Sequence, residues 1–133
     1  GFAQQPVVLL GESGQVNAIA GLDFLTTEQQ QTLLDNLPNL TLLRTWTATQ
    51  PASSVNSAVG VLPLGRTSAS APYRSTVVAP IYASDGVHGY CLLLRPAGLS
   101  EQEVSAVEEV AVVQGASAAA LEWAKQNAIG IAE

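Results

Sequence analysis

The sequence predicts an α+β domain built on one antiparallel sheet of five or six strands, with helices packed on one face and a loop-covered pocket on the other. Two observations lead to this fold class. Two apolar runs, residues 77–83 and 87–94, flank an Asp85-Gly86 pair, which favours the positive φ angles of a two-residue hairpin turn. From residue 100 onward the chain has no proline and carries regularly spaced apolar residues, a pattern typical of one long helix.

This hairpin is expected in the middle of the sheet. Neither of its runs alternates cleanly between apolar and polar residues, so each strand carries apolar side chains on both faces. A strand of that kind is covered on both faces in the folded protein. One face of the first strand would carry Val77, Ala79 and Ile81, and the other Val78, Pro80 and Tyr82.

The first third of the chain predicts a second hairpin and two helices. Residues 4–20 contain two strand-like runs separated by Gly11-Glu12-Ser13-Gly14, in which Gly14 is free to adopt positive φ. A helix capped by Thr26 or Thr27 should follow and end before Pro38. Residues 40–50 fit either a helical face or a threonine-rich strand, and we favour the helix.

The middle of the chain is predicted to form an edge strand followed by a loop. Residues 59–64 include Pro63, which cannot donate a hydrogen bond to a neighbouring strand and so belongs at a sheet edge. Residues 65–73 are rich in small and polar residues. A loop of this length in a compact domain is usually functional or mobile.

The last element is the clearest helix. Ser100 and Glu103 form a capping-box pattern at its start, and the helix is expected over about residues 100–129. Its apolar stripe would contain Val104, Val107, Ala111, Ala118 and Leu121, whereas Glu101, Glu108 and Glu122 would face solvent. Such a helix is about 40 Å long at 1.5 Å per residue, longer than one small domain needs. We therefore expect it to continue into an output domain that is missing from this chain.

Composition limits the functions open to the chain. Its 133 residues suit a single domain, and 47% hydrophobic against 12% charged residues supports a packed core. A net charge of −6 with five Lys and Arg argues against nucleic-acid binding by this segment, because phosphate neutralisation needs clustered cations. No apolar run is long enough to span a membrane, so no membrane partner is expected. The single cysteine, Cys91, fits a reducing, cytoplasmic location.

The order of these elements resembles a GAF domain over most of the chain. The matching residues are Arg74 to Ile81, then Asp85-Gly86-Val87-His88-Gly89-Tyr90, Leu99-Ser100-Glu101 and the run from Ala116 to Leu121. The final stretch, 118–133, further resembles the helix that leaves the GAF-like domain of purine-catabolism-regulator-type transcription factors. The resemblance implies a cytoplasmic sensory domain that binds a small molecule between its sheet and the overlying loops, and that dimerises through terminal helices.

Five residues are candidates for that ligand site. Arg66 and Arg74 flank the predicted pocket loop beside Tyr73, and in an acidic protein they could bind an anionic ligand through bidentate hydrogen bonds. Trp46 and Tyr90 could line the same pocket. The alternative is that the arginines are solvated loop residues and the aromatic residues belong to the core.

Other chemistry has little support in the sequence. His88, the single histidine, reads as an exposed neighbour of the hairpin turn, and Cys91 as a small buried residue in a strand. Haem or metal binding would need partner ligands that the sequence does not supply, and no cofactor is indicated. There is no catalytic serine triad pattern and no phosphate-binding glycine loop. We therefore expect a ligand-sensing regulatory domain rather than an enzyme, with a ligand-free dimerisation module as the alternative.

A homodimer through the C-terminal helix is the expected assembly. Ala111, Gly115 and Ala119 form one ridge of small residues, and Ala116, Ala120, Ala124 and Ala128 form a second about 100° around the helix. One ridge would pack on the protein's own sheet, which would leave the other for a partner helix.

Overall fold

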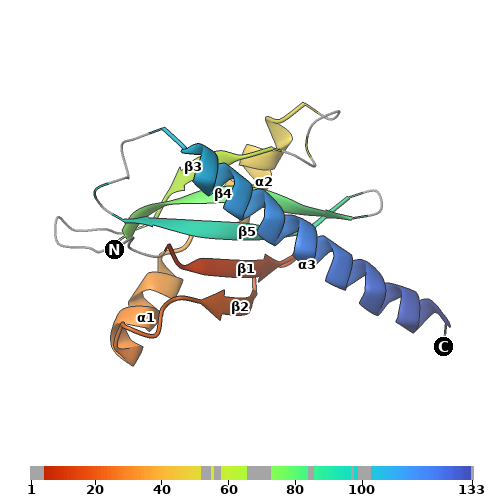
Figure 1. Cartoon of the computed structure of the whole chain (residues 1–133), viewed down its shortest axis with the longest axis horizontal. Coiled ribbons are helices and arrows are strands. Elements are labelled where there is room, and N and C mark those ends of the chain that lie inside the picture. The colour runs from red at the N-terminus through yellow and green to blue at the C-terminus, as the bar shows by residue number, and fades with distance from the viewer. Residues whose placement is uncertain are drawn as a thin grey trace.

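A five-stranded antiparallel sheet with helices on both faces forms the core of the protein (Figure 1). The computed structural model describes residues 5–51, 55, 58–65, 73–83, 86–96, 98 and 103–132, and the side chains up to residue 126. The strands are β1 (Val7–Gly11), β2 (Val16–Ala20), β3 (Gly60–Pro63), β4 (Tyr73–Ala83) and β5 (Gly86–Pro96). Their order in the sheet is β2-β1-β5-β4-β3, so the long hairpin β4–β5 lies in the middle as predicted.

Two short helices, α1 (Thr27–Asp35) and α2 (Leu40–Ala48), follow the first hairpin. Thr26 caps α1 in a capping box with Gln29, and the Asn39 side chain accepts a hydrogen bond from the backbone N–H of Leu42 at the start of α2. Leu33 from α1 and Leu43 from α2 are buried in a cluster with one face of the sheet. The helical interpretation of residues 40–50 is thereby confirmed.

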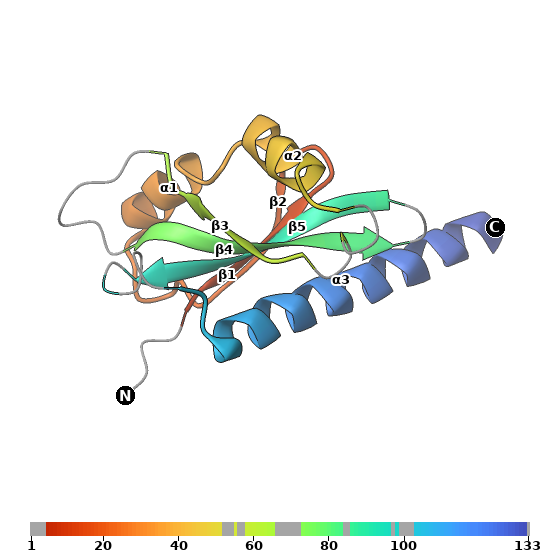
Figure 2. The same cartoon turned by 90° about the horizontal axis from the view of Figure 1, so that it is seen from above.

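The long helix α3 (Ala106–Ala132) covers the opposite face of the sheet (Figure 2). Val112 and Ala116 are buried there against Val77, Ala79 and Cys91. The expectation that all helices share one face is therefore wrong. The physical reason is that the central strands are apolar on both faces, and each face needs its own cover.

The turn of the central hairpin lies one residue earlier than predicted. Gly86 pairs with Ala83, so the two connecting residues are 84 and 85, which lie outside the described residues. Gly86 belongs to β5, and the described glycines with positive φ are Gly14, as predicted, and Gly21. No atom lies within 4 Å of a Cβ built on Gly86, so its replacement by valine is expected to be tolerated.

The start of α3 and its buried face also differ from the predictions. The expected cap, Ser100, lies outside the described residues, whereas Ser105 and Glu108 form a capping box at the observed start. Val107 and Leu121 are 77% and 61% exposed, and Glu108 is 3% exposed. The sequence-based stripe was therefore placed on the wrong side of the helix. Glu108 was expected to face solvent, but a glutamate can be buried when its carboxylate is fully hydrogen-bonded.

Candidate functional site

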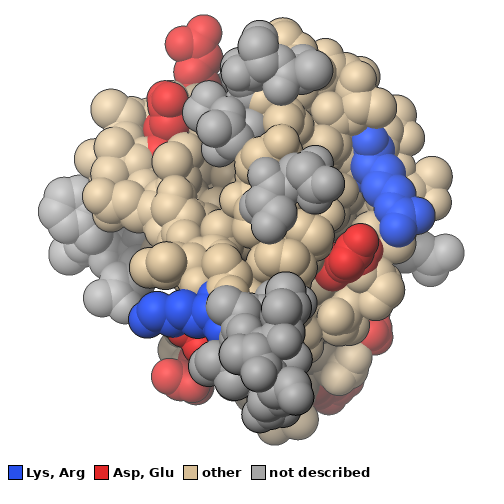
Figure 3. All heavy atoms as spheres, turned by 90° about the vertical axis from the view of Figure 1, so that its right-hand side faces the viewer, with Lys and Arg blue, Asp and Glu red and all other residues tan. Residues whose placement is uncertain are grey.

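A cavity of about 310 Å³ opens between α2 and the ends of β1 and β5. It is lined by Glu12, Arg44, Thr47, Ala48, Val87, Gly89 and Tyr90. This volume lies at the lower end of the range for small-molecule sites. Figure 3 shows the end of the molecule at which the β4–β5 hairpin turns, where few Lys and Arg side chains are visible.

A β-bulge in β5 shapes one wall of the cavity. Tyr82 pairs with Val87 and Pro80 with Tyr90, so two residues of β5, His88 and Gly89, lie opposite the single residue between them in β4. The extra residue turns Val87 and Tyr90 to the same side, where both pack with the α1–α2 cluster. Gly89 must remain glycine, because a Cβ there would overlap the carbonyl oxygen of Leu10.

The same bulge turns His88 toward α3. The imidazole stacks on the indole ring of Trp123, with ring centroids 3.8 Å apart and an interplanar angle of 16°. Its Nε2 lies 3.0 Å from the carbonyl oxygen of Ala83. The buried Nδ1 has no hydrogen bond and lies 3.8 Å from a carboxylate oxygen of Glu12. The interpretation of His88 as an exposed turn residue is therefore wrong, since the bulge sets its direction.

The wall opposite the bulge is the inner side of α2. Arg44 and Ala48 are one helical turn apart and reach the cavity from exposed positions. Thr47 lies between them, and its hydroxyl donates a hydrogen bond to the carbonyl oxygen of Leu43, 2.8 Å away. The same hydroxyl is 3.5 Å from that of the buried Tyr90, which is at the limit of a hydrogen bond. Two hydroxyl-bearing residues, Thr47 and Tyr90, therefore line the same cavity as Glu12 and Arg44.

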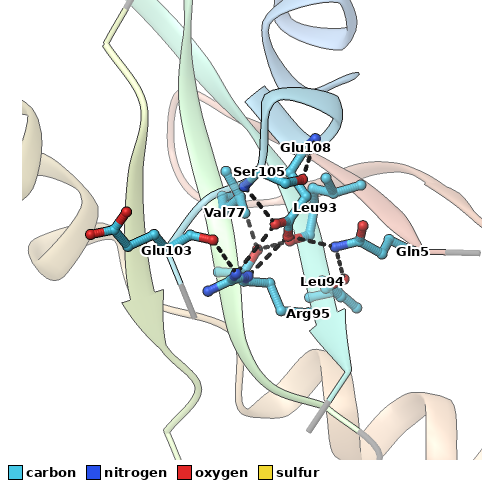
Figure 4. Close-up of polar contacts among 9 residues, drawn as sticks. Gln5, Val77, Leu93, Leu94, Arg95, Glu103, Ser105 and Glu108 are labelled. Atoms are coloured by element: carbon cyan, nitrogen blue, oxygen red, sulfur yellow. Dashed lines mark hydrogen bonds and ion pairs between the residues drawn. The ribbon is translucent and has the colours of Figure 1, made fainter. Parts of the chain in front are cut away.

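A buried ion pair fixes the start of α3 on the sheet (Figure 4). Arg95 Nε lies 2.9 Å from Oε2 of Glu108, and Arg95 Nη2 lies 3.2 Å from Oε1. The Glu108 carboxylate also accepts hydrogen bonds from the side chain of Gln5 and the backbone N–H of Ser105. Burial tends to raise the pKa of Glu108, but these hydrogen bonds and the charge of Arg95 outweigh burial and lower it.

The structure separates the five predicted site residues. Tyr90 lines the cavity, whereas Tyr73 is buried in the hydrophobic cluster at the other end of β4. Tyr73 pairs with Pro96, six residues along β5 from Tyr90, which corresponds to about 20 Å at the rise of a strand. Arg74 follows Tyr73 in β4 and is half-buried, and Arg66 lies outside the described residues. The structure therefore does not bring Tyr73 and Arg74 together with Tyr90, because the long β4–β5 hairpin holds its two ends apart.

Trp46 has a packing role beside the cavity rather than a place in its lining. A Cβ on Gly60 would overlap the indole ring, so Trp46 packs flat on the edge strand β3. Sequence reasoning missed Glu12, Arg44 and Thr47 as lining residues. The turn after β1 and the inner side of α2 meet only in the folded chain, so no local motif could have placed them together.

Other reactive groups do not form a site. Burial raises the pKa of the Cys91 thiol to about 11, so it remains protonated and unreactive at neutral pH, in agreement with its interpretation as a core residue. The described residues contain no cluster of His, Cys, Asp or Glu suited to a metal ion. Within the same residues, no helix is long and apolar enough to cross a membrane.

Comparison with known proteins does not assign a family. A scan against protein-family models found no match, and a search of curated proteins found no relative.

Proposed function

We propose that this chain is a GAF-like sensory domain that binds a small molecule in the cavity beside α2 and acts within a larger regulatory protein. The observation that carries the proposal is that the cavity and α3 share the β5 bulge. Val87, Gly89 and Tyr90 line the cavity, while His88 between them holds Trp123 of α3. The cavity residue Glu12 also lies 3.8 Å from His88. An occupant of the cavity would therefore contact residues adjacent to His88, the residue that holds Trp123 of α3.

The geometry of α3 supports an output role. The helix is anchored near its start by the Arg95–Glu108 pair and further along by the His88–Trp123 stack. Its C-terminal part extends past the ends of the strands (Figures 1 and 2). A helix that leaves the sheet after its contact with the cavity wall is suited to passing a change in its position to an output domain. A regulatory output within a cytoplasmic, purine-regulator-type protein would fit this arrangement.

A steric block of the cavity tests the proposal. We expect Ala48→Phe to fill the cavity from the exposed side of α2 without disturbing the core, and to abolish the thermal stabilisation given by any metabolite that binds the wild type. Thr41→Phe, on an exposed position of α2 outside the cavity lining, is the matched control and should leave the shift intact. An equal shift in the wild type and in Ala48→Phe would place binding elsewhere.

A homodimerisation module is the second candidate function, and the exposed face of α3 favours it. Ala106, Val107, Val110, Ala111 and Gln114 line a shallow depression of about 450 Å³ on that face. Val107, Gln114 and Leu121 recur every seven residues, with Val110 on the same side. Two antiparallel copies of α3 crossing at Gln114 would place Val107 of one copy against Leu121 of the other.

The predicted ridges of small residues need a correction in this context. Ala116 is buried, and Gly115, Ala119 and Ala120 are half-buried on the side that packs on the protein's own sheet. Members of both ridges thus serve the intramolecular core, and Ala120→Glu would test folding rather than association. We expect Val110→Glu with Leu121→Glu to dissociate a dimer in sedimentation equilibrium, and Gln126→Glu, an exposed position off this face, to leave it intact. A monomeric wild type at high micromolar concentration would remove this candidate.

A further inference from the structure

The charges around the cavity point to the chemical class of its ligand. Glu12 lies in the turn after β1 and Arg44 on α2, and both contribute to the lining of one cavity. Among the described residues, these two side chains form no ion pair with each other. Two residues of opposite charge therefore line one space of about 310 Å³ without an ion pair between them, and the Glu12 carboxylate lies 3.8 Å from Nδ1 of His88.

We propose that the cavity binds a small zwitterion of the size of a free amino acid, with its carboxylate on Arg44 and its ammonium group on Glu12. This inference rests on the proposed sensory function and names the ligand class for the same site. Arg44 offers the planar donor pair that a carboxylate accepts in bidentate fashion, and Glu12 accepts from an ammonium group. Ala48 and Val87 provide a short apolar surface beside these two charged residues.

Other ligand classes fit this charge arrangement less well. An anion drawn to Arg44 would also face the carboxylate of Glu12, and a cation drawn to Glu12 would face Arg44. A neutral ligand would leave both charges to be partly desolvated without a partner, which is unfavourable. A ligand that carries both charges satisfies both side chains at once. The small volume excludes large zwitterions and agrees with a molecule of few heavy atoms.

Calorimetric titration with valine and two blocked forms of valine tests the proposal. N-acetylvaline lacks the ammonium group and valine methyl ester lacks the carboxylate, while both keep the apolar part. Free glycine, alanine, valine and leucine are titrated first to find the one that binds most tightly. We expect this amino acid to bind the wild type at least tenfold more tightly than either blocked form of valine. Arg44→Gln should remove only the preference for the free amino acid over the methyl ester. Glu12→Gln should remove only the preference for the free amino acid over the N-acetyl compound. Lys125→Gln, a cation of α3 outside the lining, is the control and should change neither preference.

The outcomes separate this inference from the function on which it rests. Blocked forms that bind as tightly as free valine would overturn the zwitterion assignment. The assignment would also be wrong if the protein bound no free amino acid but did bind an organic phosphate, a dicarboxylate or a sugar. If Ala48→Phe blocked that binding, the sensory function would stand. If neither the amino acids nor these compounds bind, both the ligand class and the sensory function are wrong.

Discussion

At the scale of single residues, three residues have roles set by partners far away in the sequence. Glu108 is buried because Arg95 and Gln5 meet it, and His88 is turned from the cavity side to the α3 side by one extra residue in β5. Gly115 is needed because α3 passes directly over Cys91, and a Cβ there would lie 2.9 Å from the sulfur. The sequence suggested a packing reason for Gly115, but the partner of each residue became visible only in the fold.

Gly115→Ala should destabilise the protein although alanine is the better helix former. Alanine gains about 1 kcal/mol in helix propensity, but crowding a packed core costs about 1–3 kcal/mol. Since Cys91 is buried in the cluster beneath α3, it has little room to move. We expect chemical denaturation to show a lower free energy of unfolding for Gly115→Ala than for the wild type. The decrease in the double variant Gly115→Ala, Cys91→Ala should be smaller than the sum of the decreases in the two single variants. Ser117→Ala, on the exposed side of α3, controls for helix propensity. Additive losses would contradict the contact.

The Arg95–Glu108 pair should make stability depend on pH in acid. The pKa of Glu108 is lowered in the folded state, so its contribution is fully present above the pKa of a glutamate in the unfolded chain, roughly 4.3, and is lost as pH falls through the lower folded value. We expect the free energy of unfolding of Glu108→Gln to fall less in that range than that of the wild type. At neutral pH the variant should lose roughly 3–5 kcal/mol, because Arg95 is left buried without its counter-charge. Glu109→Gln, its exposed neighbour, should behave as the wild type; equal acid profiles of Glu108→Gln and the wild type would exclude the pair as the cause.

At the scale of elements, local signals were sufficient for most of the fold. The two hairpins, the cap of α1 at Thr26, the helix at residues 40–48 and the edge strand with Pro63 follow from short-range patterns, and the structure contains each of them. The orientation of α3 could not be predicted in this way. Its two sides both carry small and apolar residues, so hydrophobic periodicity gave no unique buried face, whereas in the structure the contact of Glu108 with Arg95 and the packing of Val112 and Ala116 lie on the side that meets the sheet.

The His88–Trp123 stack should control the distal half of α3. The substitution His88→Ala removes the ring contact with Trp123. Contacts between aromatic side chains contribute about 0.5–1.5 kcal/mol. In a Trp46→Phe background, Trp123 is the only tryptophan left. We expect its emission to shift to longer wavelength and amide exchange near Trp123 to accelerate, while exchange near Val112 stays unchanged because Glu108 still anchors the start of the helix. Lys125→Ala is the control; uniform acceleration along α3 would indicate general destabilisation instead.

At the scale of the whole molecule, the sheet separates two surfaces with different chemistry. One side carries α1, α2 and the cavity, and the other carries α3 with its exposed apolar face. The strands that form the cavity wall also hold α3, so the proposed ligand binding and the proposed assembly through α3 would be coupled rather than exclusive alternatives. The sequence predicted the sheet and a pocket but placed the pocket near Tyr73, because an arginine-containing loop was the strongest local signal.

The positions of ligand-induced changes along the chain show whether a bound small molecule in the cavity affects α3. Two-dimensional NMR of the isotope-labelled chain, titrated with free amino acids and the other small molecules named above, reports binding at each amide. We predict that a compound that binds shifts the amide signals of Glu12, residues 44–48 and residues 87–90, and that the shifts extend through His88 to Trp123. Shifts centred on Tyr73 and Arg74, or shifts at the cavity that stop short of α3, would contradict it.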